Sequence, residues 1–342
     1  MIEARVEHTA TLMADGRVLA VGGVTANSEP AASTEVYDAA SGAWTASGNL
    51  AEARRHHTAT LLTDGSVLVT GGNSLGAAES IIAMASAERY HPVTASWSGA
   101  GQMLAGRVNH TATLLSDGTV LVAGGEIAAG EGFRRLASAE RYDPRTGSWT
   151  ATGSMVGARA YHTAILLPDD TVLVAGGFEA DDLASAELYD PRTGTWATTG
   201  TMLLGRVSHQ VAPLPDGKVL VTGGMSRSSN GELASAEMYD PQTGSWTAAG
   251  QMTRARFRHT ATMLPDGSVL VAGGRLGDEG LASAELYDPR SGARAATATM
   301  IDTRSDHEAT LLPDGTVLLV GGYQRLDQLV EAAVLYYPAT GS

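Results

Sequence analysis

Seven polar residues at one repeated position all differ from one another, and they are the first candidates for chemistry in this chain. Each lies immediately before a histidine that recurs about every 50 residues. The seven are Glu7, His56, Asn109, Tyr161, Ser208, Arg258 and Asp306. The histidine after this position and the arginine two residues before it are the same in every unit. The variety therefore predicts side chains that line a polar pocket, and the alternative is a solvated rim where nothing constrains the residue.

Three of these residues could carry out catalysis. Asp306, Glu7 and His56 belong to units seven, one and two, which become neighbours if the units form a closed ring. Two carboxylates and an imidazole can bind a divalent metal or act as an acid/base group. The alternative to a catalytic cluster is an ordinary network of salt bridges at the rim. Arg258 could pair with Asp306 or hold an anionic substrate.

The elements that position these residues are short strands. In the second unit, 57–62 (His-Thr-Ala-Thr-Leu-Leu) predicts a first strand, and the Asp64-Gly65 turn leads to a second strand at 67–69. Glu-x-Tyr at 88–90 predicts a third strand. A tight turn, Asp-Pro-x-Thr-Gly in three units and a related sequence in the others, leads to a fourth strand that contains tryptophan in five units.

Seven units of four strands predict an all-β fold, a seven-bladed β-propeller. We interpret 1–342 as a single domain with units at about 1–49, 50–102, 103–154, 155–201, 202–251, 252–299 and 300–342. Unit six has Arg294 in the tryptophan position. Unit seven ends before that position, which leaves two alternatives: a last blade of three strands, or a longer natural chain.

The double glycines and the spaced Tyr and Trp of these units resemble the kelch-repeat family, of the bacterial type. The resemblance extends from Arg5 to Tyr337. It implies kelch blades, and it implies little about function, because kelch propellers include both enzymes and binding modules. The copper-radical oxidases with such propellers need a tyrosine crosslinked to cysteine, and this sequence has no cysteine.

The recurring charged and imidazole groups are expected to be structural. A histidine repeated seven times around a channel cannot converge on one metal ion, so we expect it to satisfy a backbone group. Each histidine follows an arginine by three residues, and a glutamate recurs on the third strand in six units. We expect Arg–Glu pairs. In unit seven Val334 replaces the glutamate, which should leave one arginine unpaired or otherwise engaged.

The loops between second and third strands give a further set of candidates. The residue after each Gly-Gly pair differs between units, and loops on a rigid scaffold commonly carry binding residues. The binding candidates in these loops are Asn73, Glu126, Phe178, Met225, Arg275 and Tyr323. The sequence thus favours a ligand-binding or interaction module, with a small molecule, glycan or peptide at the channel mouth. The alternative is a metal-assisted hydrolase or lyase centred on Asp306, Glu7 and His56.

Composition limits the partners. The net charge of −14 argues against nucleic acid as a partner. The sequence contains no run of 18 apolar residues, so it predicts no membrane span. Met1 falls at a position that is methionine in most other units, so the chain begins inside a repeat. We expect either a cytoplasmic protein, as the chain is written, or a secreted one after removal of a leader.

Overall fold

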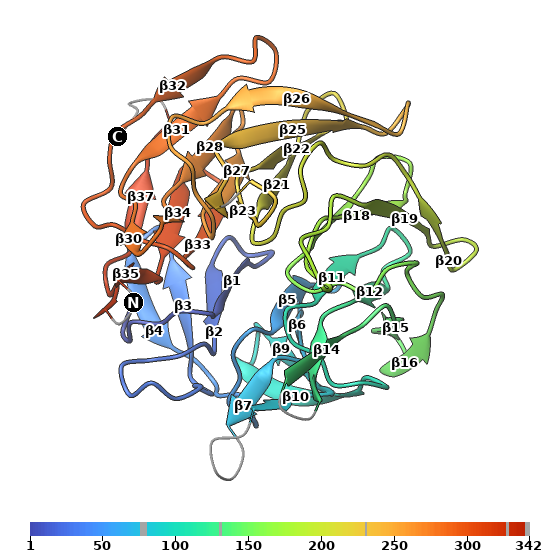
Figure 1. The fold of residues 1–342 in the computed structure, drawn as a ribbon. Coiled ribbons are helices and arrows are strands. Elements are labelled where there is room, and N and C mark those ends of the chain that lie inside the picture. The colour runs from blue at the N-terminus through green and yellow to red at the C-terminus, as the bar shows by residue number, and fades with distance from the viewer. Residues whose placement is uncertain (76–80, 130–131, 230, 326–327, 339–342) are drawn as a thin grey trace.

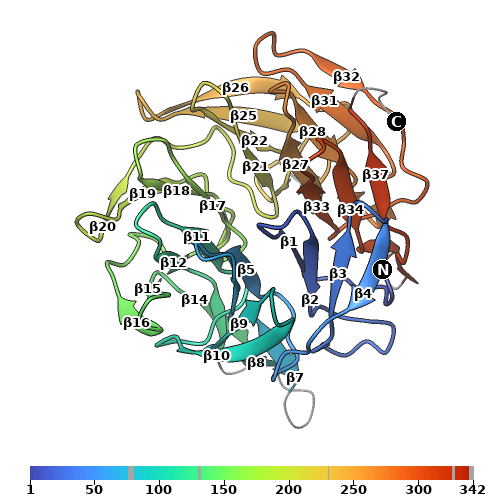
Figure 2. The same cartoon turned by 180° about the vertical axis from the view of Figure 1, so that it is seen from behind.

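The computed structural model describes residues 1–75, 81–129, 132–229, 231–325 and 328–338. Within these ranges the chain forms strands and turns, and seven antiparallel sheets stand around a central channel (Figures 1 and 2). This confirms the predicted seven-bladed β-propeller. In the part of the chain that the structure describes, no helical segment is long and apolar enough to cross a bilayer.

Blades one to four each contain four strands in antiparallel order. Their strands are β1 (Thr9–Leu12), β2 (Val18–Val21), β3 (Thr34–Asp38) and β4 (Ala43–Ala46); β5 (Thr58–Leu61), β6 (Val67–Thr70), β9 (Ser86–His91) and β10 (Ser96–Gln102); β11 (Thr111–Leu114), β12 (Val120–Ala123), β15 (Ala139–Asp143) and β16 (Ser148–Ala151); β17 (Thr163–Leu166), β18 (Val172–Ala175), β19 (Ala186–Asp190) and β20 (Thr195–Thr198).

Blades five and six also have four strands, and blade seven has three in the described residues. Their strands are β21 (Gln210–Pro213), β22 (Val219–Thr222), β25 (Ser235–Asp240) and β26 (Ser245–Gln251); β27 (Thr260–Met263), β28 (Val269–Ala272), β31 (Ala284–Tyr287) and β32 (Arg294–Ala296); β33 (Glu308–Leu311), β34 (Val317–Val320) and β37 (Val334–Tyr336). The three strands of the last blade agree with the first of the two alternatives, within the described residues.

Five short hairpins extend the loops between second and third strands, and the sequence pattern did not predict them. They are β7 (Asn73–Leu75) with β8 (Ile81–Ala83), β13 (Glu126–Ala129) with β14 (Gly132–Arg135), β23 (Met225–Ser226) with β24 (Gly231–Glu232), β29 (Arg275–Leu276) with β30 (Glu279–Gly280), and β35 (Tyr323–Arg325) with β36 (Gln328–Leu329). These hairpins belong to blades two, three, five, six and seven.

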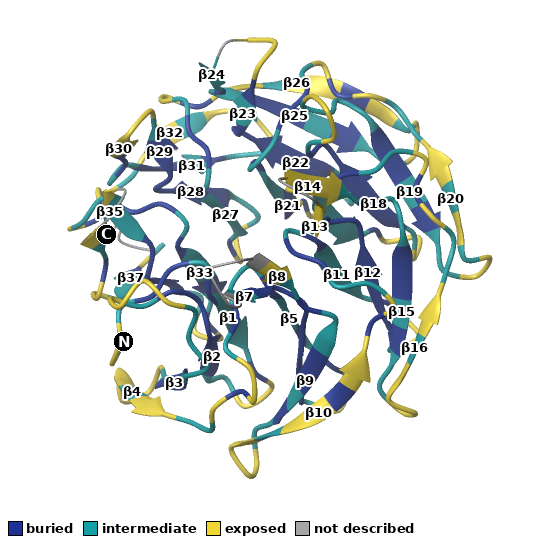
Figure 3. Ribbon diagram, turned by 60° about the horizontal axis from the view of Figure 1, so that its bottom comes forward, coloured by how far each residue is buried: buried dark blue, intermediate teal, exposed yellow. Residues whose placement is uncertain are grey.

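The hydrophobic core lies between blades rather than inside one. Seven buried clusters each combine residues of two neighbouring blades, such as Leu115 of blade three with Val172 of blade four. The ring closes in the same way, because Val18 of blade one packs with Leu318 of blade seven and β1 lies beside β33. Second strands are therefore buried and outer strands exposed (Figure 3).

The glycine pair permits this close contact between blades. A Cβ on Gly124 would lie 2.6 Å from the Arg159 carbonyl oxygen of the next blade, and one on Gly125 would lie 2.6 Å from the Val108 carbonyl oxygen. Neither distance is compatible with a side chain. Both glycines also have positive φ, 64° and 88°, which favours glycine at both positions.

Arg294 occupies the position of the repeated tryptophan in blade six, and it makes the same kinds of contact. In five blades the tryptophan ring lies against the tyrosine of the third strand at 5.0–5.1 Å between centroids. The guanidinium of Arg294 lies over the Tyr287 ring at 4.5 Å. It also donates to the Ala249 carbonyl oxygen of the preceding blade at 2.9 Å, as Trp246 does to Gly200 O.

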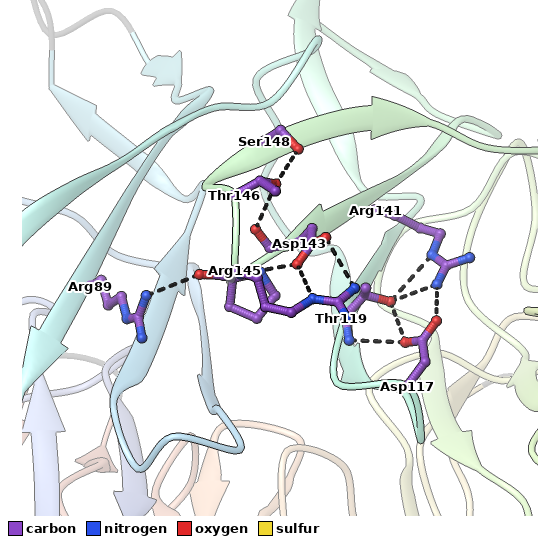
Figure 4. A network of polar contacts seen from close by, with 9 residues as sticks. Arg89, Asp117, Thr119, Arg141, Asp143, Arg145, Thr146 and Ser148 are labelled. Atoms are coloured by element: carbon purple, nitrogen blue, oxygen red, sulfur yellow. Dashed lines mark hydrogen bonds and ion pairs between the residues drawn. The ribbon is translucent and has the colours of Figure 1, made fainter.

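The face formed by the first–second and third–fourth turns is built from local contacts. Arg145 donates to the Asp143 carboxylate at 3.0 Å, and Arg141 pairs with Asp117 (Figure 4). Arg89 reaches across to the Pro144 carbonyl oxygen of the next blade at 3.3 Å. Because these side chains hold the turns themselves, this face offers few free groups for recognition.

One turn on this face departs from the repeat and provides a prediction. In six units the second turn residue is glycine with φ between 82° and 87°, and in blade four it is Asp170 with φ 71°. We expect Asp170→Gly to raise the free energy of unfolding by about 0.5–1 kcal/mol, because relief of left-handed strain exceeds the added chain entropy. Chemical denaturation measures the change.

Gly118→Asp is the matched reverse substitution, since Gly118 occupies the same turn of blade three at φ 83°. It should lower the free energy of unfolding. A loss of stability in Asp170→Gly would instead mean that the hydrogen bond from Ser116 to Asp170 outweighs the strain.

Candidate functional site

The seven variable residues identified in the sequence, here called the ring residues, surround one cavity on the channel axis. The cavity, here called the mouth cavity, has a volume of about 350 Å³. It lies at the start of the first strands, on the face opposite the turn network. Its ring residues are Glu7, His56, Asn109, Tyr161, Ser208, Arg258 and Asp306. The geometry therefore brings together side chains from all seven blades.

Every ring residue has left-handed backbone geometry. Their φ angles run from 51° at Ser208 to 57° at Tyr161. Backbone hydrogen bonds between neighbouring blades hold this geometry, as from Tyr161 N–H to Asn109 O at 3.1 Å and from Asp306 N–H to Arg258 O at 3.1 Å. A non-glycine residue in this region costs about 1–2 kcal/mol, so a position under structural selection only would favour glycine or asparagine.

Where blade one meets blade two, the ring residues are a glutamate and a histidine, Glu7 and His56. Glu7 Oε2 lies 3.1 Å from His56 Nε2 and 3.2 Å from Arg55 Nη1. Burial opposes ionisation of Glu7, but the hydrogen bond and charge of His56 outweigh it and lower the pKa of the carboxyl. Glu7 is therefore an ionised acceptor whose contacts are already satisfied.

Asp306 forms its salt bridge with the neighbour on its other side, Arg258 of blade six. Its Oδ2 accepts from Arg258 Nη1 at 3.2 Å and from Ser305 Oγ at 3.3 Å. Burial raises the pKa of the Asp306 carboxyl in spite of Arg258. In the described ranges, no three His, Cys, Asp or Glu side chains form a metal-ligating group. The three residues of the predicted Asp306/Glu7/His56 cluster are thus divided between two pairs, Glu7–His56 and Asp306–Arg258.

A neutral and hydrogen-bonding sector lies at blades three and four. The Asn109 side chain and the Tyr161 hydroxyl both donate to Glu126 Oε1 at 3.0 Å. Arg135 Nε pairs with the other oxygen of Glu126 at 3.2 Å. Burial, followed by the charge of Glu126, raises the pKa of Tyr161. Glu126, predicted from its loop position, therefore orients two ring residues.

A second tier below the ring contains a carboxyl group that we did not predict. Glu308 lines the mouth cavity at a position that is threonine in five blades and Gln210 in another. Burial, with the charge of Asp306 above it, raises the pKa of Glu308 to about 8. The break in the threonine pattern was the signal that could have identified it.

The threonines of this tier bond the repeated histidines. Thr9 Oγ1 lies 3.0 Å from His57 Nε2 of the next blade, and Thr163 Oγ1 lies 3.0 Å from His209 Nε2. We expected the histidines to satisfy a backbone group. Their Nε2 atoms contact threonine hydroxyls, and the backbone of Thr70 and Arg107 also hydrogen-bonds His110. His8, which faces the Glu308 position, has no hydrogen-bond partner for either ring nitrogen among the described residues.

A lateral pocket of about 680 Å³ adjoins the mouth cavity and shares Tyr161, Ser208 and Arg258 with it. Two predicted loop residues, Phe178 and Met225, line this lateral pocket. The guanidinium groups of two arginines lie 4.8 and 4.7 Å from the Phe178 ring. These arginines, Arg135 and Arg227, were not predicted, because the pairing across the loops depends on the hairpins.

The other three loop candidates line neither cavity. Asn73 is 2 % exposed and Arg275 is 8 % exposed. Arg275 lies over the Phe257 ring at 5.6 Å and pairs with Asp278 at 3.4 Å. Burial, followed by the charge of Glu7, raises the pKa of Tyr323. These residues hold the loops, since each forms a β-bridge to the residue just before a ring residue.

Comparison with known families agrees with this architecture. The pattern described as the kelch motif matches residues 107–156, 159–203 and 207–253. No curated protein matches the sequence.

Two solved structures share the fold. One is described as a novel fungal alcohol oxidase with catalytic diversity among the AA5 family, in complex with copper. It has a TM-score of 0.75 and 18% identity, and the alignment covers 94% of this chain and 70% of that chain. The other is the structure of YjhT, with a TM-score of 0.63, 15% identity, and coverage of 82% of this chain and 94% of that one.

Proposed function

Since this chain belongs to the kelch-repeat β-propellers, we propose that it is a ligand-binding module. Its ligand is a small polar molecule, or the terminal unit of a glycan or peptide, held in the mouth cavity by the ring residues. The volume of about 350 Å³ falls within the range of ligand pockets, roughly 300–1,000 Å³.

One observation carries this proposal. Seven chemically different side chains converge on the mouth cavity, and each has the left-handed backbone conformation that favours glycine. Strain of this kind persists where the surrounding structure over-determines it, and it concentrates at binding and catalytic sites. Retaining Tyr161, Arg258 and Glu7 at such positions is best explained by the use of their side chains.

The charges of the cavity suggest what the ligand offers. Glu7 is paired with Arg55 and His56, and Asp306 is paired with Arg258. The ligand need not neutralise an isolated ionised group at the ring, so a hydroxyl-rich or zwitterionic molecule suits it. A longer glycan or peptide would continue into the lateral pocket.

Substitution of Arg258 tests the proposal once a ligand is found by thermal-shift screening against glycans, peptides and metabolites. We expect Arg258→Gln to weaken binding about 10-fold or more, since a hydrogen bond to a charged group contributes about 1.5–3 kcal/mol. Isothermal titration measures the affinity.

Arg192→Gln is the matched control, because it removes the same charge from an exposed side chain of the turn face. It should leave the affinity unchanged. Equal weakening by both substitutions, or none by Arg258→Gln, would contradict a site at the mouth cavity.

A hydrolase or lyase remains the second candidate function, and Glu308 favours it. A carboxyl group whose pKa is near 8 is protonated at neutral pH and can serve as a general acid. The metal-assisted form of this function uses Asp306, Glu7 and His56. It requires the Glu7–His56 and Asp306–Arg258 pairs to rearrange. Metal content of the purified protein and of a Glu7→Ala/Asp306→Ala variant distinguishes the two forms. Stoichiometric metal that is lost in the variant supports the metal-assisted enzyme.

A further inference from the structure

The arginine that precedes each repeated histidine is fully buried, and six of the seven bind a carboxylate in one geometry. In blade four Arg159 Nη2 contacts Glu187 Oε1 at 2.7 Å and donates to Ser185 Oγ at 3.2 Å. The six pairs are Arg5–Glu35, Arg54–Glu88, Arg107–Glu140, Arg159–Glu187, Arg206–Glu237 and Arg256–Glu285.

The same carboxylate also accepts backbone N–H groups from the segment that leads to the arginine. Glu187 accepts from Val156 N–H at 2.7 Å and from Gly157 N–H at 3.1 Å. Glu140 accepts from Leu104 N–H and Ala105 N–H in the same way, at 2.6 and 3.2 Å. The repeat therefore builds a cradle for one carboxylate from a guanidinium and two amides.

Blade seven keeps the arginine and the chain segment that leads to it, and it lacks the carboxylate. Val334 pairs with Leu319, the register in which Glu187 pairs with Val174. Ala332 stands where the other blades have serine. Both acceptors for the second guanidinium nitrogen are thus replaced by apolar side chains.

Arg304 responds as an unpaired buried cation. It is 0 % exposed, and its Nη1 donates to Leu319 O at 3.3 Å and to Ala332 O at 3.2 Å. Its Nη2 has no partner in the described part of the chain. The Nε atoms lack partners in all seven arginines, so Nη2 is what distinguishes blade seven. Burial lowers the pKa of Arg304 to about 10, and the charge of Asp302, two residues before it, opposes this shift only in part.

We propose that blade seven contains a site for a small carboxylate anion, formed by Arg304 Nη2 and the backbone N–H groups of Ile301 and Asp302. These two residues are at the positions of Val156 and Gly157 in blade four. The anion takes the place of the missing glutamate carboxylate. An uncompensated buried charge is unfavourable, and an anion that reaches it removes that cost.

Formate is the smallest probe with this chemistry. We expect sodium formate to raise the Tm of the protein saturably by about 2–4 °C at pH 7. The comparison is with the sodium salt of the bulky sulfonate MES at equal ionic strength. Val334→Glu supplies the carboxylate from the chain, so its Tm without formate should exceed that of the unmodified protein by a similar amount, and formate should add nothing.

Val334→Ala is the matched control, because it leaves the cradle open and should keep the response to formate. Three results would overturn the proposal: equal Tm of the unmodified protein in formate and MES, an equal gain from formate in Val334→Glu, or a folded Val334→Glu with a Tm below that of the unmodified protein.

Discussion

Acidification should unfold this protein over a narrow pH interval below about pH 6, with uptake of several protons per molecule. The cause is the set of seven repeated histidines that follow the ring residues, all of which are buried. Burial lowers the pKa of His8, His110 and His209 to about 3. It lowers the pKa of the other four well below the ordinary value. The four are His57, His162, His259 and His307.

The sign of this effect follows from which state binds the protons. Below pH 6.5 the unfolded chain protonates its histidines, whereas the folded protein keeps them neutral. Stability is therefore complete above pH 6.5 and is lost as pH falls. Each histidine contributes up to about 1.4 kcal/mol per pH unit, and seven give up to about 10 kcal/mol per pH unit. That exceeds what a marginally stable fold tolerates over a unit or two.

Guanidinium denaturation at a series of pH values from 5 to 7 measures the slope of stability against pH. His110→Gln should reduce the slope by about one proton, since a glutamine does not titrate. His91→Gln is the control, because His91 is partly exposed at the end of β9 and contacts Ser98. A slope of two protons or fewer would contradict the expectation that the histidine ring controls acid unfolding.

The fold could be predicted because each unit repeats the same local rules. Turn residues such as Asp64-Gly65, a buried second strand and the glycine pair recur in register, so errors in one unit are corrected by the others. The structural pairing of arginine with glutamate could also be predicted, including its absence at Val334. The ring residues were found in the opposite way, as a position where the repeat varies.

The site was harder to predict, because it depends on contacts between units. Nothing in the sequence shows that Tyr161 has left-handed backbone geometry, or that it shares the Glu126 acceptor with Asn109. Sequence adjacency around the ring suggested that Asp306 joins Glu7 and His56. Ring order also offered Arg258 as a partner of Asp306, and the structure shows that pair. Ring order alone could not decide between the two neighbours, because side-chain pairing also depends on reach and direction.

Glu308 should make the protein less stable as pH rises, opposite to the effect of the histidines. Its pKa of about 8 exceeds the ordinary value of 4.5, so between these values the folded protein holds a proton that the unfolded chain has released. Stability is lost as pH rises through this interval, by on the order of 3 kcal/mol between pH 5 and pH 8. Glu308→Gln removes the titration and should become steadily more stable than the unmodified protein over this range.

The difference in free energy of unfolding between the two proteins isolates Glu308, because the histidines titrate equally in both. Glu279→Gln, whose side chain is 73 % exposed, should show no such difference. A constant difference between Glu308→Gln and the unmodified protein would mean that Glu308 is ionised in the fold. A growing difference would show that the chain retains a destabilising carboxyl beneath the ring residues, and selection keeps such groups where they act on a ligand or substrate.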